Sequence, residues 1–494
     1  MKKSVISLAL CVATVLTPVS SSFASSDTSV HIASIAEQRF ERRALEAGIW
    51  FIPQVLYETI ASETIAKFGG DRNSTVYFFE RPVTWHAQMM TGNNNTPYVH
   101  TYHSIEDGPV VIEIPAATEE NAFFGTLLDS WHKPLIDVGP DGADQGKGGK
   151  YLIVPKGYKG DTDGYIVVEQ DTFQGYTTIR SMTKTTSEED MKGHVDYVTK
   201  GVRMYPLGSS NIHTTFKAMD NVVIDTHLQW QDHFSTSFWE RAHQALQNEV
   251  IKSDEKAMYG MLRYLGLEKG EAFAPSQHQQ VMLNEASVKL HAEMKDSFTH
   301  YAPKLWGEQS QWTIPVNPEM MLTNATYTAD YWHDYAGRGT TFSYYIAPPK
   351  SLAESRSTTY IKGILDADGN PMFGDYDYTI HVPANVPAER FWSFLTYSME
   401  TGSFIYEADR LGWASNEPEM AFNQDGSTDI YWSSDCESRG YTNCMPITKG
   451  EQFFTLFRLY GPQADFFNGN FVLDDIQRID TGVFQGSCHH LLAY

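Results

Sequence analysis

Asp225 and His227 form the residue pair whose types and spacing are best suited to chemistry. They lie in the run 222–230, where apolar and polar residues alternate and therefore predict a β-strand. Because side chains two positions apart share one face of a strand, this carboxylate and this imidazole would be neighbours. Such a pair can bind a metal ion or transfer a proton. The alternative is that both residues belong to the solvent-facing side of an amphipathic strand.

Arg458 is the third candidate catalytic residue, after Asp225 and His227. It lies in the run 453–460, which is apolar on both faces, as a buried central strand would be. An unpartnered guanidinium is costly to bury, so we expect an ion pair with a carboxylate, and Asp429 is one candidate. The alternative is an arginine that binds an anionic ligand in a cleft.

Tyr98, His100 and Trp392 are the candidate ligand-binding residues. His100 and His103 lie three positions apart in a predicted strand, so they face opposite sides and are not expected to bind one metal ion together. Trp392 belongs to a rich set of aromatic residues that either lines a groove for a flat ligand or fills the cores. A pocket that joins one of the histidine or aspartate candidates to Arg458 or Tyr98 would favour an enzyme. Dispersed residues would favour binding or a structural role.

The sequence lacks the common catalytic signatures, namely the G-x-S-x-G nucleophile elbow, the H-E-x-x-H zinc motif and the G-x-x-x-x-G-K-[ST] phosphate loop. We predict no metal ion and no cofactor. The chain has 61 acidic and 37 basic residues, which give a net charge of −24. Such a charge repels nucleic-acid phosphates and anionic lipids, so neither is an expected partner.

The first residues predict an export signal. Lys2 and Lys3 precede an apolar stretch from Val5 to about Val19, and Ser22–Ala24 fits the small-x-small cleavage rule. A rival interpretation makes Cys11 a lipid-attachment site. The apolar stretch is too short to span a bilayer, and no later segment is long and apolar enough to do so. We therefore expect an exported protein, periplasmic or secreted, with no transmembrane segment.

The alternation of apolar and polar residues predicts a mainly β chain with a helical insert, an α+β multidomain architecture. We expect two antiparallel β-sandwich modules, jelly-roll-like, joined by a helical segment. Cys436 and Cys444 flank a short polar loop and are expected to form a local disulfide, which leaves Cys488 free or as an alternative partner. The predicted boundaries are a signal peptide at 1–24, a helical lead at 25–75, a first β module at 76–234, a helical insert at 235–310 and a second β module at 311–494.

Two sets of short motifs are distributed along most of the chain. They are Asn93–Tyr98, Gly108–Ile112, Asp137–Gly139, Gly148–Pro155 and Gly157–Gly160 in the first set, and Asp366–Gly369, Tyr378–Ile380, Phe391–Ser393, Asp425–Tyr431 and Phe457–Pro462 in the second. With these motifs the chain resembles the bacterial proteins that pair the domain of unknown function numbered twelve fifty-four with the one numbered twelve fourteen. The resemblance implies two β-sandwich modules and no established reaction. The family often has Asp where Asn95 stands and Trp where Cys444 stands, and an amide at position 95 cannot act as a base.

These observations favour an exported binding or assembly protein that uses a sandwich surface or the cleft between its modules. Its expected partner is a small molecule, a glycan or a protein, including a second copy of the chain in a homo-oligomer. The alternative is an extracytoplasmic hydrolase of a glycan or an ester. Its catalytic residues would come from distant strands, which short sequence motifs do not reveal.

The cysteine assignment predicts that thiol labelling of the exported, unreduced protein modifies one cysteine. The bridge between Cys436 and Cys444 protects both, and reduction before labelling should expose them. Three reactive thiols without reduction would refute this bridge.

Overall fold

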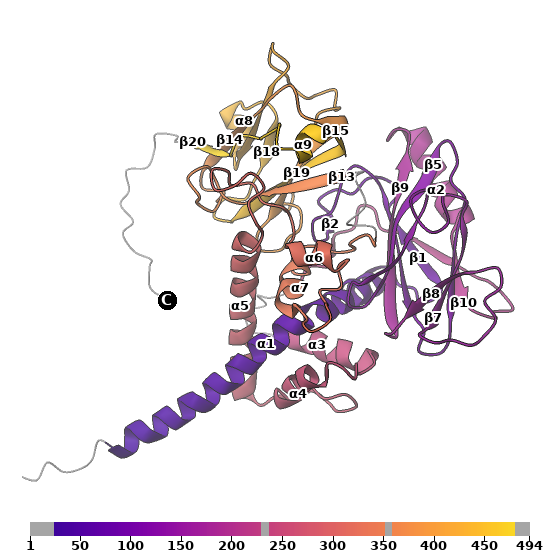
Figure 1. Cartoon of the computed structure of the whole chain (residues 1–494), viewed down its shortest axis with the longest axis vertical. Helices are drawn as coiled ribbons and strands as arrows, with labels where there is room; N and C mark the ends of the chain where they lie inside the picture. The colour runs from indigo at the N-terminus through magenta and orange to yellow at the C-terminus, as the bar shows by residue number, and fades with distance from the viewer. Residues whose placement is uncertain (1–23, 229–236, 351–357, 480–494) are drawn as a thin grey trace, which may run out of the picture.

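A computed structural model describes residues 24–228, 237–350 and 358–479. Figure 1 shows two sheet-rich modules, with the long first helix running from the lower left up to the first module and crossing a second long helix. The predicted signal segment before residue 24 lies outside the described residues, and so do Trp230 of the predicted strand and Cys488. No helix in the described ranges combines the length and apolar character needed to cross a membrane.

The first module packs a six-stranded sheet against a four-stranded sheet. Apolar side chains such as Val99, Val110 and Ile153 are fully buried between them, as the alternating pattern predicts. The first sheet runs β11 (Thr215–Ala218), β1 (Thr75–Phe78), β3 (Tyr98–Ser104), β9 (Gln174–Thr183), β5 (Asn121–Asp129) and β6 (Pro134–Val138), and the second runs β10 (Arg203–Pro206), β4 (Val110–Ile114), β7 (Gly149–Pro155) and β8 (Ile166–Gln170). Helix α2 (Glu188–Gly201) follows β9, and a short pair joins β2 (Ala87–Gln88) to β12 (Ile224–Asp225).

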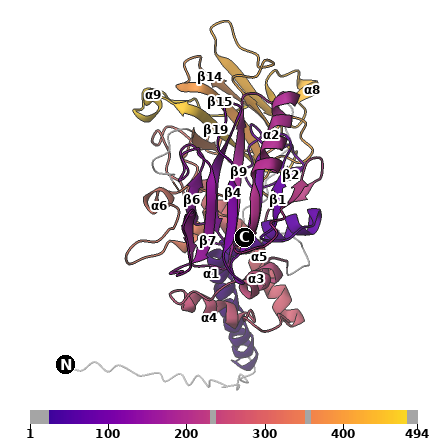
Figure 2. The ribbon, with the colours of Figure 1, turned by 90° about the vertical axis from the view of Figure 1, so that its right-hand side faces the viewer.

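The second module contains two four-stranded sheets around an aromatic core that includes Phe394, Trp432 and Phe457. Figure 2 shows β15 and β19 of this module above the strands of the first. One sheet runs β13 (Thr358–Gly363), β19 (Phe453–Pro462), β15 (Ala388–Ser398) and β16 (Gly412–Ala414), and the other runs β18 (Cys444–Pro446), β17 (Thr428–Ser433), β14 (Asp377–Val382) and β20 (Gln477–Ile479). Short helices α8 (Cys436–Arg439) and α9 (Ala464–Phe467) flank β17 and β19.

The helical part of the chain has its own core, in which Trp50 and Trp239 are almost completely buried. Helix α5 begins with a capping box in which Ser276 and Gln279 satisfy each other's backbone amides. The helices are α1 (Ala24–Phe68), α3 (Ser237–Asn248), α4 (Lys256–Tyr264), α5 (Gln277–His300), α6 (Pro318–Leu322) and α7 (Tyr335–Thr341).

The predicted fold class is confirmed, and so is the disulfide between Cys436 and Cys444. The sheets are mostly antiparallel, but β11, β8 and β18 each pair in parallel at a sheet edge. The strand predicted over 222–230 is shorter than expected, because only Ile224–Asp225 pairs, with β2. An alternating pattern indicates which side chains share a face. It does not indicate whether a neighbouring strand is available to form the backbone hydrogen bonds.

Glu249 connects the helical part to the first module. It is 5% exposed and accepts hydrogen bonds from Ser130 Oγ at 2.7 Å, Phe173 N at 3.0 Å and Gln174 N at 2.8 Å. Burial raises the pKa of this carboxyl to about 7, although the hydrogen bonds act in the opposite direction.

The Glu249→Gln variant should lose a pH-dependent part of the stability. The folded chain holds the Glu249 proton more tightly than the unfolded chain does. Its contribution is therefore fully present below the ordinary carboxyl pKa and is lost as the pH rises through about 7. Between pH 5 and pH 8 the wild type should lose about 2 kcal/mol more than the variant, measured by urea unfolding. Parallel curves for the two proteins would contradict this assignment.

Candidate functional site

The loop of residues 89–97, named here the connecting loop, joins β2 to β3 of the first module and contacts the second module. Thr91 donates its backbone N–H to the carbonyl of Gly402 at 2.7 Å and its hydroxyl to the carbonyl of Tyr344 at 2.9 Å. The hydroxyl of Tyr397 donates to the carbonyl of Gly92 at 2.6 Å. These bonds fix the loop against the second module.

Arg458 lies in the middle of the sheet that the connecting loop contacts, between Tyr360 of β13 and Ser393 of β15. Its side chain is only 2% exposed. Nη2 donates to the hydroxyl of Tyr397 at 2.6 Å and makes longer contacts of 3.4 and 3.5 Å with the carbonyls of Gly92 and Thr91. Nε and Nη1 are buried and have no hydrogen-bond partner among the described residues. This is unusual, because nearly all buried polar groups are paired.

The predicted ion pair between Arg458 and Asp429 is wrong. Asp429 lies on β17, in the other sheet of the module, where it stands opposite His381. The carboxylate accepts a hydrogen bond from His381 Nδ1 at 2.8 Å and another from Asn423 at 3.2 Å. Arg458 forms no ion pair with any described residue. Both residues belong to predicted strands, but the pattern did not reveal in which sheet each strand lies.

Arg180 brings a second guanidinium to the same place from the first module. It lies on β9, directly opposite Tyr98 of β3, and forms a hydrogen bond with Tyr360 of the second module. Arg180 likewise has no carboxylate partner within the described ranges, and its charge interacts with that of Arg458. We call the following residues the arginine–tyrosine cluster: Tyr98, Arg180, Tyr360, Tyr397, Arg458 and Tyr460.

Phenol groups surround both guanidiniums in this cluster. The Arg458 guanidinium lies over the ring of Tyr360 at 4.8 Å, an attractive cation–π contact. Burial alone would raise the pKa of the Tyr360 hydroxyl, but Arg180 and Arg458 outweigh it and hold this pKa below its ordinary value. Tyr98, Arg180, Tyr360 and Tyr460 are each part-exposed, so solvent reaches one side of the cluster.

Two asparagines of the connecting loop complete the cluster. Asn93 and Asn95 donate their side-chain N–H groups to the hydroxyl of Tyr460 at 3.2 and 2.8 Å. Asn93 Oδ1 accepts from the backbone N–H of Asn95 at 3.0 Å, which fixes the orientation of the Asn93 amide. Position 95, where an amide stands in place of the family's frequent Asp, therefore lies at the cluster.

Of the candidate ligand-binding residues, Tyr98 lies in the cluster and His100 lies beside it. The His100 ring stacks on the Tyr98 ring at 5.7 Å, and its Nδ1 bonds with the Thr178 hydroxyl at 3.1 Å. Burial lowers the pKa of His100 to about 4, so the ring is neutral. Trp392 instead packs inside the second module against Phe394 and Phe457.

Asp225 and His227 contact each other through the carboxylate and the ring Nδ1, at the end of the short strand β12. His227 also interacts electrostatically with His291 of α5. No contact in the described structure joins this pair to Arg458. The described residues also contain no group of three or more histidine, cysteine, aspartate or glutamate side chains placed to hold a metal ion.

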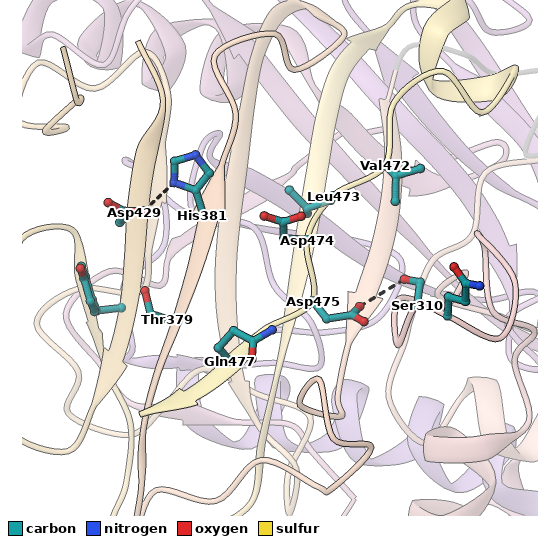
Figure 3. A pocket seen from close by; sticks show the side chains of 11 residues that line it. Ser310, Thr379, His381, Asp429, Val472, Leu473, Asp474, Asp475 and Gln477 are labelled. Atoms are coloured by element: carbon teal, nitrogen blue, oxygen red, sulfur yellow. Dashed lines mark hydrogen bonds and ion pairs between the residues drawn. The ribbon is translucent and has the colours of Figure 1, made fainter. Parts of the chain in front are cut away.

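A surface pocket of about 510 Å³ lies on the outer face of the second module, away from Arg458's sheet. Figure 3 shows the hydrogen-bonded pair His381 and Asp429 on one side, Asp474 near the middle and Asp475 with Ser310 on the other. The lining contains three aspartates and no lysine or arginine. His381 alternates with the buried Ile380 and Val382 along β14 and therefore faces outward.

Two protein-family models match the chain. One, described as a protein of unknown function (DUF1254), matches residues 74–206, and the other, a protein of unknown function (DUF1214), matches residues 357–464. The chain pairs a DUF1254 domain with a DUF1214 domain. The arginine–tyrosine cluster joins them, because Tyr98 and Arg180 come from the DUF1254 domain and Tyr360 and Arg458 come from the DUF1214 domain.

Two solved structures are similar to the chain to different degrees. The crystal structure of the VPA0106 protein from Vibrio parahaemolyticus is 17% identical, with a TM-score of 0.50, and the match covers 89% of this chain and 100% of that one. That of an uncharacterized protein from Burkholderia cenocepacia is 11% identical, with a TM-score of 0.38, over 92% of this chain and 96% of that one. A search of curated proteins found no match. The first likeness shows that this chain shares its fold with the VPA0106 protein.

The sequence did not identify Arg180, Tyr360 or Tyr397 as site residues. Each lies in a strand whose alternation is typical of an ordinary sheet. The available signal was an arginine in the mostly apolar and hydroxyl-bearing run 174–183, the same signal that singled out Arg458.

The two arginines should make Tyr360 ionise at lower pH than Tyr98 and Tyr397, because burial raises the pKa of those two hydroxyls. In an alkaline titration followed by phenolate absorbance, the wild type should show an early component below the ordinary tyrosine pKa of 10.0. The Tyr360→Phe variant should lack it, and the Arg180→Gln variant should shift it to higher pH because one positive charge is gone. Identical curves for wild type and Tyr360→Phe would refute this electrostatic picture.

Proposed function

We propose that this is an exported binding protein that holds a small molecule between its two modules, at the arginine–tyrosine cluster. The observation that supports the proposal is the buried Arg458 side chain, whose Nε and Nη1 lack partners in the described structure. A buried donor without an acceptor costs about 1–3 kcal/mol, more when it is charged. A ligand that supplies the acceptors would recover that free energy on binding.

The arrangement around Arg458 suits a binding site in other respects. Both modules contribute side chains to the cluster. In proteins of two domains, small-molecule sites are often found at the interface between the domains. The connecting loop and Tyr397 hold the guanidinium through Nη2 alone, so its remaining donors stay in a fixed direction. Such preorganisation reduces the entropy that a ligand would otherwise lose on binding.

An extracytoplasmic hydrolase is the competing proposal, and it would use the contact between Asp225 and His227. A hydrolase at that pair should release product from chromogenic esters or glycosides, and Asp225→Asn should reduce that rate. The binding proposal requires no turnover and depends on Arg458 and Tyr460 instead. The two proposals therefore differ in which residues matter.

A thermal-shift screen tests the binding proposal. The purified chain should gain several degrees in unfolding temperature with at least one compound from a panel of sugars, amines, amino acids, organic acids and sugar phosphates. The Tyr460→Phe and Arg458→Met variants should lose most of that gain, because they remove groups of the cluster.

The matched control is Tyr331→Phe, since the Tyr331 side chain is 90% exposed and remote from the cluster's contacts. It should keep the full shift. A panel in which no compound stabilises the wild type, or in which the cluster variants respond as the wild type does, would contradict the proposal.

A further inference from the structure

We infer that the ligand held between the modules carries an oxyanion, a carboxylate or a phosphate group, and that Arg180 and Arg458 bind it. This inference rests on the proposed function and adds the charge and chemical class of the ligand. The two sources share one chemistry, because both present negatively charged oxygens to guanidinium N–H groups.

The two positive charges of the cluster are not balanced by a carboxylate of the described protein. Arg180 and Arg458 act on each other with like charge, and the groups around them are phenols and amides. Neither arginine forms an ion pair with a carboxylate in the part of the chain that the structure describes. A buried cation without a counter-charge is strongly unfavourable, whereas an anion between two cations would be stabilised by both.

Arg458 also has hydrogen-bond donors left over. The Nε of an arginine carries one N–H and Nη1 carries two, so Arg458 has three N–H groups for which the described protein supplies no acceptor. A neutral hydroxyl ligand would accept from them but would leave both positive charges uncompensated. An oxyanion offers several lone pairs together with the missing charge.

Tyr460 adds a further donor. Its hydroxyl oxygen already accepts from the side chains of Asn93 and Asn95, so its proton is available for another acceptor. Tyr397 is different, because its proton is already donated to Gly92 while its oxygen accepts from Arg458. Three N–H groups of Arg458 and the proton of Tyr460 thus lack an acceptor in the described protein, and such donors suit an anion.

Asn95 adds no negative charge to the cluster. Its amide lies 2.8 Å from the Tyr460 hydroxyl, at the rim of a cluster without a carboxylate. An aspartate at this position would place an internal negative charge near the two guanidiniums. Such a charge would compete with an external anion, so the amide leaves the positive charge available to a ligand.

The cluster is positively charged, whereas the molecule as a whole is acidic. The whole chain has a net charge of −24, and the surface pocket beside His381 is lined by Asp429, Asp474 and Asp475. An anion would be repelled from that pocket. Binding of an oxyanion is therefore expected at the cluster and not in the surface pocket.

Isothermal titration of the purified full chain at constant ionic strength tests the inference. The probes are sodium citrate and acetate for carboxylates, inorganic phosphate for phosphates, and glucose and spermidine as neutral and cationic comparisons. We expect an oxyanion to bind, with affinity reduced by about tenfold or more in Arg180→Gln and in Asn95→Asp. Both positions are part-exposed, so these variants should fold even where substitution of Arg458 does not.

The control variant is Arg81→Gln, which removes an exposed arginine of the first module that pairs with Glu188, and it should bind as the wild type does. Citrate or acetate binding without phosphate binding would assign a carboxylate, and the reverse would assign a phosphate. Oxyanion binding that survives both cluster variants, or no oxyanion binding at all, would overturn the inference. Glucose or spermidine binding that depends on Arg458 would overturn it while leaving the proposed function intact.

Discussion

One contact between the two modules depends on how the buried guanidinium of Arg458 is kept in place. Its charge lies inside the second module's sheet, where it needs hydrogen-bond partners. The connecting loop supplies backbone carbonyls, and Tyr397 supplies a hydroxyl. Because that loop comes from the first module, the contact that satisfies part of Arg458 also joins the two modules. The fold and the candidate site are therefore determined by the same set of contacts.

The cluster combines two requirements that usually conflict. A buried charge is stable when every donor is paired, but a binding site needs donors that are free. Here Nη2 of Arg458 is bound by the protein, while Nε and Nη1 are not, and Arg180 adds a second charge from the opposite module. The phenols reduce the free-energy cost of burying these charges, because Tyr360 lies against the Arg458 guanidinium and hydrogen-bonds with Arg180. An acceptor supplied by a ligand would recover the free energy that these unpaired donors cost.

Much of the fold could be predicted from the sequence, since two-residue alternation depends only on which side chains face a core. The disulfide was also predictable, because Cys436 and Cys444 are close in the chain. The site was harder, because Asn93 and Tyr460 are separated by 367 positions and meet only through sheet pairing and packing between modules. Arg458 could be singled out as a charge in an apolar strand, but its neighbours could not. Trp392 shows the same difficulty, since an aromatic residue in a strand fits a groove and a core equally well.

The central claim is that the unpartnered N–H groups of Arg458 bind an acceptor that a ligand supplies. A crystal structure of the protein grown with citrate tests this most directly. The account predicts an oxyanion in hydrogen-bond contact with Nε or Nη1 of Arg458 and with Arg180, between the two modules. A carboxylate of the protein itself bound to those nitrogens, with citrate elsewhere or absent, would contradict it.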